Sequence, residues 1–121
     1  MNVEEFRNFC LSFPDASEGM PFQGVFKNSR AIFVFYVGGK MFCLFDLDQF
    51  DRCTLKCDPN FIEDPREQKG IDKPFNLSPR HWVSLDLKGD VSWDVIKELV
   101  AKSYKLVSEG TSNKKKQNNL F

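Results

Sequence analysis

Two adjacent glycines, Gly38-Gly39, constrain the fold of this chain more strongly than any other feature of the sequence. They separate two stretches rich in apolar residues, 31–37 and 40–46. Both central residues of a two-residue hairpin turn need positive φ angles, which glycine adopts at no steric cost. The sequence therefore predicts two antiparallel strands joined by a tight turn.

The turn also predicts how the two strands pair. With Val37 opposite Lys40, each further pair follows by counting away from the turn. The expected pairs are Tyr36 with Met41, Phe35 with Phe42, Val34 with Cys43, Phe33 with Leu44 and Ile32 with Phe45. Side chains of alternate residues point to opposite faces of a strand, so this register assigns every residue of the hairpin to one face or the other.

Both faces of the predicted hairpin are apolar. One face carries Ile32, Val34, Tyr36, Met41, Cys43 and Phe45, and the other carries Phe33, Phe35, Phe42 and Leu44. A sheet with one solvated face instead alternates apolar and polar residues. We expect helices to cover one face, and either the segment 58–80 or a second copy of the chain to cover the other.

Helical spacing of apolar residues predicts a helix at each end of the chain. The first spans residues 3–13. The last begins after Ser92, its N-cap, and ends at Gly110. Its apolar stripe consists of Val95, Ile96, Leu99, Val100, Ser103, Tyr104 and Val107. The remaining residues, 111–121, include three consecutive lysines and are predicted to form a disordered basic tail after a single domain of residues 1–110.

Between the helices the sequence predicts further short elements. They are a loop over 14–21, strands over 22–27, 50–57 and 82–87, a short or kinked helix after Asp58 limited by Pro65, and an irregular segment up to Arg80. The strand over 50–57 alternates polar and apolar residues and is expected near an edge of the sheet. We predict an α+β fold with a central antiparallel sheet of four to five strands, packed with the N- and C-terminal helices.

The overall charge is balanced. Seventeen basic and seventeen acidic residues give a formal net charge of +0, so any contact with DNA would require a local cluster of basic residues. Four cysteines without a secretory pattern are typical of a reduced cytoplasmic protein. No apolar run approaches the ~20 residues that span a bilayer, so we expect no membrane partner.

Five short motifs follow one another along the chain. They are Gly38-Gly39-Lys40-Met41-Phe42, Leu55-Lys56-Cys57-Asp58-Pro59, Arg66-Glu67-Gln68, His81-Trp82, and Ile96-Lys97-Glu98-Leu99 with Ser103-Tyr104-Lys105-Leu106-Val107. In this order and spacing the chain resembles the MmcQ/YjbR family of small bacterial proteins, from about Phe6 to Gly110. The resemblance implies an α+β domain with packed terminal helices, and DNA binding through paired wing-like elements.

The basic residues inside or beside these motifs are the candidate DNA-binding residues. They are Lys40, Lys56 and Arg80, together with His81. Lys40 is expected at the hairpin tip, where a winged DNA binder places a phosphate contact; the alternative is a solvated turn lysine. His81 changes charge near neutral pH and could contact phosphate; the alternative is a buried histidine that fixes the loop to the strand.

The sequence indicates no reaction. It contains no phosphate-binding glycine loop, no Ser/His/Asp order and no metalloprotease helix signature. Cys53 and Cys57 would lie about 13 Å apart on a strand, too far to share a metal. We therefore predict a non-enzymatic protein without catalytic residues, metal, cofactor or small-molecule ligand. Trp82 and Tyr104 are interpreted as structural anchors. The alternative function is a protein-interaction or dimeric adaptor module that uses an apolar sheet face.

Overall fold

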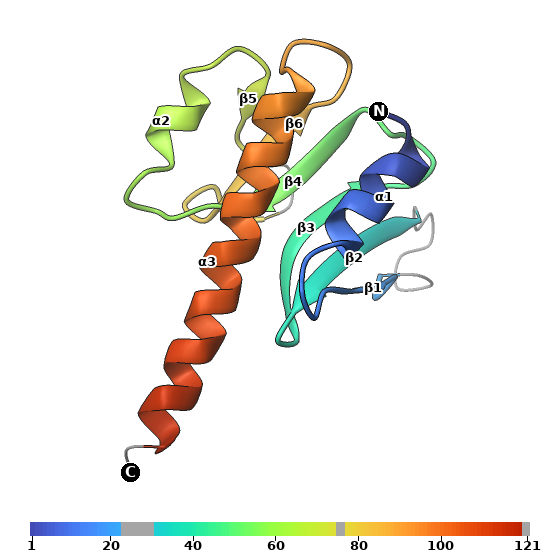
Figure 1. Cartoon of the computed structure of the whole chain (residues 1–121). Coiled ribbons are helices and arrows are strands. Elements are labelled where there is room, and N and C mark those ends of the chain that lie inside the picture. The colour runs from blue at the N-terminus through green and yellow to red at the C-terminus, as the bar shows by residue number, and fades with distance from the viewer. Residues whose placement is uncertain (23–30, 75–76, 120–121) are drawn as a thin grey trace.

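The computed structural model describes residues 1–22, 31–74 and 77–119, and of 111–119 the backbone alone. Its elements follow in the order α1 (Val3–Leu11), β1 (Ser17–Gly19), β2 (Ile32–Val37), β3 (Lys40–Asp46), β4 (Arg52–Lys56), α2 (Glu63–Arg66), β5 (Ile71–Asp72), β6 (Trp82–Asp86) and α3 (Trp93–Asn119). Figure 1 shows α1 and α3 packed beside one sheet. The predicted α+β fold with terminal helices is confirmed.

The sheet has six antiparallel strands in the order β1-β2-β3-β4-β6-β5. The two strands at its edges, β1 and β5, lie in segments expected to be irregular. Each is too short to show an alternating pattern in the sequence. The strand predicted over 22–27 lies outside the described residues, apart from Phe22, which is in a turn.

The strand β4 lies between β3 and β6, so its predicted position near an edge is wrong. The polar residues that suggested an edge all belong to one face of the strand. Arg52 and Lys56 on this face pair with β6, where Arg52 contacts Ser84 and Lys56 lies over the ring of Trp82. The polar residues at alternate positions of β4 therefore indicate that one face of the sheet is partly polar. They do not indicate an edge strand.

The hairpin turn forms as predicted, but the register is correct only next to the turn. Gly38 and Gly39 have φ angles of 59° and 77°. Val37 pairs with Lys40 and Tyr36 with Met41. Beyond these pairs the register shifts by one residue, and the observed partners are Phe35 with Cys43, Val34 with Leu44, Phe33 with Phe45 and Ile32 with Asp46.

The shift is a β-bulge that places an extra residue, Phe42, in β3. As a result the consecutive residues Phe42 and Cys43 both face the helices. The ring of Phe42 meets Tyr104 of α3 edge to face at 5.5 Å, and both Phe42 and Cys43 are 0% exposed. The hydroxyl of Ser103 donates a hydrogen bond of 2.5 Å to the carbonyl of Phe42. Core packing against α3 therefore decides the register.

The core lies between the sheet and the two long helices. From α1 it receives Phe6 and Cys10, and from α3 it receives Ile96, Val100 and Val107. The sheet contributes aromatic residues to the same layer. The rings of Phe33, Phe35 and Phe45 stack on one another at 5.9–6.4 Å between centroids.

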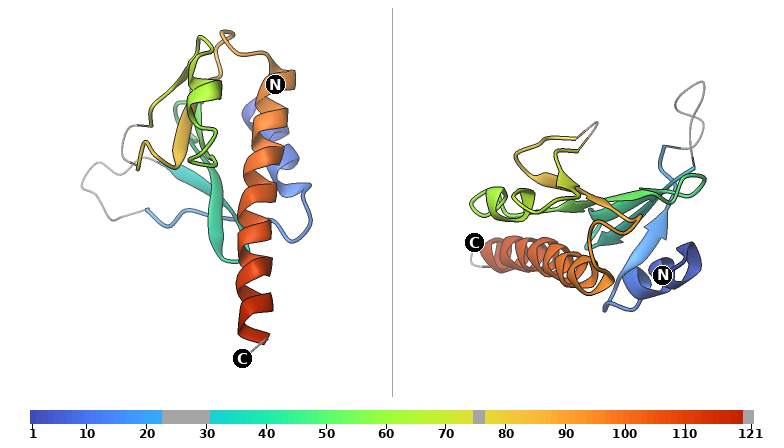
Figure 2. Two further views of the ribbon diagram at one scale, coloured as in Figure 1. Left: turned by 90° about the vertical axis from the view of Figure 1, so that its left-hand side faces the viewer. Right: turned by 90° about the horizontal axis from the view of Figure 1, so that it is seen from above.

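The other face of the sheet is covered in part by the segment before β6. Figure 2 shows residues 73–74 and 77–81 on the side of the sheet away from α1 and α3. On this face Val34 is 0% and Trp82 is 6% exposed. The predicted cover by the segment 58–80 is thus present, while self-association of the chain remains a prediction.

The predicted end of the last helix at Gly110 is wrong. The helix α3 continues to Asn119, so residues 111–119 have a helical backbone where a disordered tail was expected. A Cβ atom at Gly110 would meet nothing within 4 Å, which places this residue on an open side of the helix. Extending an existing helix fixes one residue per hydrogen bond, so a glycine penalty of about 1 kcal/mol does not stop it. The last turns of α3 extend beyond the sheet (Figure 1).

The short helix α2 begins later than expected. Asp58 accepts a hydrogen bond of 2.9 Å from the amide of Asn60 and so stabilises a turn. The helix itself starts at Glu63 and contains Pro65. Proline is tolerated in the first turn of a helix, where amide groups have no intrahelical partner.

In the described part of the chain, no helix is both long and apolar enough to cross a membrane.

Candidate nucleic-acid interface

The four candidate DNA-binding residues lie at one end of the sheet. The neighbouring strands β3, β4 and β6 are antiparallel in turn, so the start of β3, the end of β4 and the start of β6 share an end. These positions are Lys40, Lys56 and, directly before β6, Arg80 and His81. Two strand spacings separate β3 from β6, which corresponds to about 10 Å. We call this set of four residues the basic end.

Lys56 is held in place by the ring of Trp82. The two residues are cross-strand partners, and the ammonium lies 5.0 Å from the ring centroid. A cation over an aromatic face is stabilised by about 0.5–2 kcal/mol, depending on its exposure. The stem of Lys56 is half-buried, so its ammonium is confined to a small region at this end of the sheet.

Lys40 and Lys56 line one small hollow. It has a volume of about 180 Å³ and is completed by Met41 and by Leu106, Val107 and Gly110 of α3. None of these six lining residues is acidic. Lys40 is exposed at the hairpin tip. The hollow therefore lies between the hairpin tip that carries Lys40 and the part of α3 that leads to Lys114, Lys115 and Lys116. The ammonium of Lys56 lies on the other face of the sheet, over the ring of Trp82.

Arg80 and His81 are positioned by backbone contacts. The amide of His81 donates to the carbonyl of Ser78 at 3.1 Å, and its carbonyl accepts from the amide of Cys57 at 2.7 Å. Arg80 is exposed and His81 half-buried. The backbone of His81 thus fixes the loop to the residue that follows β4.

One residue that positions this loop was not among the candidates. Arg66, whose side chain is 11% exposed, donates to the carbonyls of Pro79 and Trp82, the latter at 3.0 Å. Its guanidinium also lies 3.6 Å from Glu63. Arg66 therefore ties α2 to the segment that presents Arg80. The sequence signalled it only as part of a matched motif, because its partners lie in an irregular segment.

Trp82 and Tyr104 make the contacts expected of residues that join elements. Trp82 is buried on the face away from the helices, where the half-buried Lys56 lies over its ring. Tyr104 stacks on Phe13 with 4.7 Å between centroids and donates its hydroxyl to the carbonyl of Pro14 at 2.6 Å. It thereby connects α3 to the segment after α1.

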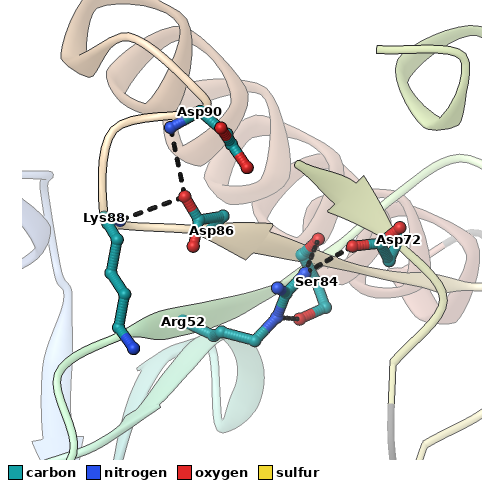
Figure 3. A network of polar contacts seen from close by, with 6 residues as sticks. All are labelled: Arg52, Asp72, Ser84, Asp86, Lys88 and Asp90. Atoms are coloured by element: carbon teal, nitrogen blue, oxygen red, sulfur yellow. Dashed lines mark hydrogen bonds and ion pairs between the residues drawn. The ribbon is translucent and has the colours of Figure 1, made fainter. Parts of the chain in front are cut away.

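Acidic residues gather at the opposite end of the sheet. They are Asp46, Asp48, Asp51, Asp86 and Asp90, which lie at or just beyond the other ends of β3, β4 and β6. Figure 3 shows part of this region: Asp86 accepts from the amides of Lys88 and Asp90, both at 3.1 Å. The ammonium of Lys88 lies 3.7 Å from Asp51. Arg52, Lys69 and Lys88 also lie at this end, paired with Asp72, Asp90 and Asp51, and Asp58 borders the basic end. A balanced total charge therefore coexists with a partial separation of charge along the strands.

Two of the cysteine thiols have raised pKa values. Burial, followed by the charge of Asp58, raises the pKa of the half-buried Cys57 thiol, and a protonated thiol is a poor nucleophile. Burial also raises the pKa of Cys43 well above its usual value. Among the described residues, no three histidine, cysteine or acidic side chains are grouped so that they could hold a metal ion.

A YjbR family model matches residues 11–106, which is most of the chain. The chain belongs to the YjbR family. None of the curated proteins compared with it matches. Among solved structures, a Deinococcus radiodurans protein with a DUF419 domain is 32% identical with a TM-score of 0.77, over 88% of this chain and 78% of that one.

Two structures of a Pseudomonas syringae protein share the fold. The crystal structure is 20% identical with a TM-score of 0.71, over 88% of this chain and 99% of that one. The solution structure gives 20% identity and a TM-score of 0.68, over 88% and 93% of the two chains. At this identity the two structures show a shared fold.

Proposed function

We propose that this YjbR-family protein binds nucleic acid through the basic end and catalyses no reaction. One observation supports the proposal: Lys40, Lys56, Arg80 and His81, far apart in sequence, lie at the same end of three neighbouring strands. Most of the aspartates on or next to these strands lie at the opposite end of the sheet. A local field of this kind attracts a polyanion even when the total charge is balanced.

In the proposed complex the basic end contacts phosphate oxygens. Lys40 would bind one phosphate beside the hollow, and Lys56, restrained by the ring of Trp82, would bind another on the opposite face of the sheet end. Arg80 would add a further contact from the neighbouring strand. Phosphate contacts position a protein on nucleic acid without reading its sequence. Two or three contacts of this kind give weak, sequence-independent binding whose strength falls as salt rises.

The experiment is a salt series with a short labelled DNA duplex, followed by fluorescence anisotropy. We expect log K to fall against log salt with a slope of about −2 to −3, since each phosphate contact contributes about −0.9. Lys40→Gln and Arg80→Gln should each weaken binding and reduce the slope by about one contact. The matched control is Lys88→Gln, which removes the same charge at the acidic end, where Lys88 lies near Asp51.

Two results would refute the proposal. One is the absence of binding at about 50 mM salt, where phosphate contacts are strong. The other is an equal loss of affinity in the Lys40→Gln and Lys88→Gln proteins, since that would mean total charge, and not the basic end, determines binding.

The alternative of an adaptor that uses an apolar sheet face has less support. Residues 73–74 and 77–81 lie over part of that face (Figure 2), and Val34 and Trp82 on it are buried. The large apolar side chains that are exposed in the described part of the chain are Leu47 and Phe61. Neither belongs to a strand, so a protein partner would use a different surface.

A further inference from the structure

A groove of about 450 Å³ runs between α2 and α3. Its floor includes Leu55 and Val83, which are 1% and 2% exposed. Along α3 its wall extends from Leu99 to Glu109, a length of about 15 Å at the rise of an α-helix. We call it the α2–α3 groove. It meets the hollow of the basic end at Lys56 and Leu106 but is otherwise separate from it.

The groove offers an apolar contact that the chain itself leaves open. Leu99 and Leu106 line it from α3, and Phe61 lines it from the segment before α2. Phe61 is 63% exposed, the largest value among the exposed apolar residues described. Aromatic side chains beside a pocket commonly become the anchors of protein interfaces, because they bury a large area on binding.

The two walls of the groove carry opposite charges. Asp58 and Asp64 line the wall on the side of α2. Lys102, Lys105 and Glu109 line the wall on the side of α3, which keeps a net positive charge, and Lys56 lies at the end of β4 between them. The lysines form exposed pairs along their own helix, Lys102 with Glu98 at 3.2 Å and Lys105 with Glu109 at 3.9 Å. Exposed pairs of this kind are weak, so their ammonium groups can turn to a partner.

We infer that the α2–α3 groove binds an amphipathic helix of a partner protein. The apolar face of that helix would contact Phe61, Leu99 and Leu106. One flank would carry basic residues opposite Asp58 and Asp64, and the other would carry acidic residues opposite Lys102 and Lys105. Helices commonly bind in apolar grooves with the charges on the rim setting the choice of partner.

The charges argue against nucleic acid in this groove. A phosphate backbone laid between the walls would be repelled by Asp58 and Asp64, which lie on the side facing Lys102. The inference therefore concerns a surface and a class of partner different from those of the proposed function, and neither depends on the other. A helix also suits the length of the wall along α3, which corresponds to about three helical turns.

The test uses three synthetic helical peptides with the same apolar face. The flanks of the first are basic on one side and acidic on the other, those of the second are both basic, and those of the third are both acidic. Each is titrated into the full ¹⁵N-labelled chain. We expect the first peptide to bind at least tenfold more tightly than the others, with amide shifts at Phe61, Leu99 and Leu106.

Charge reversal in the protein makes the test specific. Asp64→Lys leaves Asp58 beside a lysine and so cancels the charge of the α2 wall, which should raise the affinity of the acidic peptide relative to the other two. Lys102→Glu likewise opposes Lys105 on the α3 wall and should raise the relative affinity of the basic peptide. Asp64 and Lys102 are both exposed, so these changes leave the core intact. The matched control is Glu67→Lys, the same change of charge at an exposed residue outside the groove, which should leave the order of the peptides unchanged.

Five outcomes would overturn the inference. Four are equal affinity for the three peptides, shifts that lie outside the groove, the same change of preference in the Glu67→Lys protein, and shifts of the amides of Phe61 and Leu99 by duplex DNA. A doubling of the sedimentation mass that Phe61→Ser abolishes would also overturn it, because the occupant would then be a second copy of the chain.

Discussion

Replacing Trp82 with alanine should destabilise the protein by about 3–5 kcal/mol, as truncation of a buried aromatic residue does. The side chain is 6% exposed. At about 25 cal/mol per Å², the roughly 150–250 Å² that such a side chain buries corresponds to about 4–6 kcal/mol, of which alanine keeps about 1. Loss of the contact with Lys56 adds about 0.5–1 kcal/mol, which keeps the estimate near the upper part of the range.

Urea unfolding followed by circular dichroism measures this effect. With a slope of about 2 kcal/mol per M, the unfolding midpoint should fall by about 2 M. The control is Leu47→Ala, a residue 37% exposed, which should change the free energy of unfolding by about 0.5 kcal/mol or less. A loss below ~1 kcal/mol for Trp82→Ala would refute the reasoning, since Trp82 would then be free to contact a partner.

Three further changes test other contacts. Ser103→Ala should cost about 1–3 kcal/mol in urea unfolding, because it leaves the buried carbonyl of Phe42 without its partner; an unchanged midpoint would mean that this carbonyl finds another donor. Arg66→Met should speed hydrogen exchange at the amides of His81 and Trp82, which both donate to Ser78 in the loop that Arg66 holds; unaltered exchange there would show that Arg66 does not order the loop. Cys57 should react with iodoacetamide more slowly than a free thiol, with a midpoint at higher pH than that of the free thiol, because burial raises its pKa and only the thiolate attacks; a midpoint at or below that of the free thiol would contradict this.

The sequence predicted those parts of the fold that depend on neighbouring residues. Gly38-Gly39 was sufficient for the turn and for the pairs nearest to it, because the φ angles of a turn are a local property. The bulge at Phe42 could not be predicted, since it depends on how Phe42 and Cys43 pack against α3 and α1. The edge strands β1 and β5 were missed because two or three residues contain no period.

For the candidate site, too, the sequence predicted what depends on the strands and missed what depends on contacts between distant segments. The register of β3, β4 and β6 was enough to bring Lys40, Lys56 and His81 to one end, and the sequence predicted these strands. The role of Arg66 was not predictable, because its contacts with Pro79 and Trp82 cross 13 and 16 residues of chain. The α2–α3 groove was also missed, because it exists only after α2 and α3 have packed against the end of β4.

The separation of charge along the strands gives this neutral protein an electric dipole. The zero net charge contributes no attraction to a polyanion, but the dipole is turned by the field so that its positive end leads and is then attracted. The torque is large only within about one Debye length, roughly 10 Å at 0.1 M salt. At low ionic strength the same dipole aligns neighbouring molecules head to tail, so that the solubility of the protein near its isoelectric point should increase when salt is added.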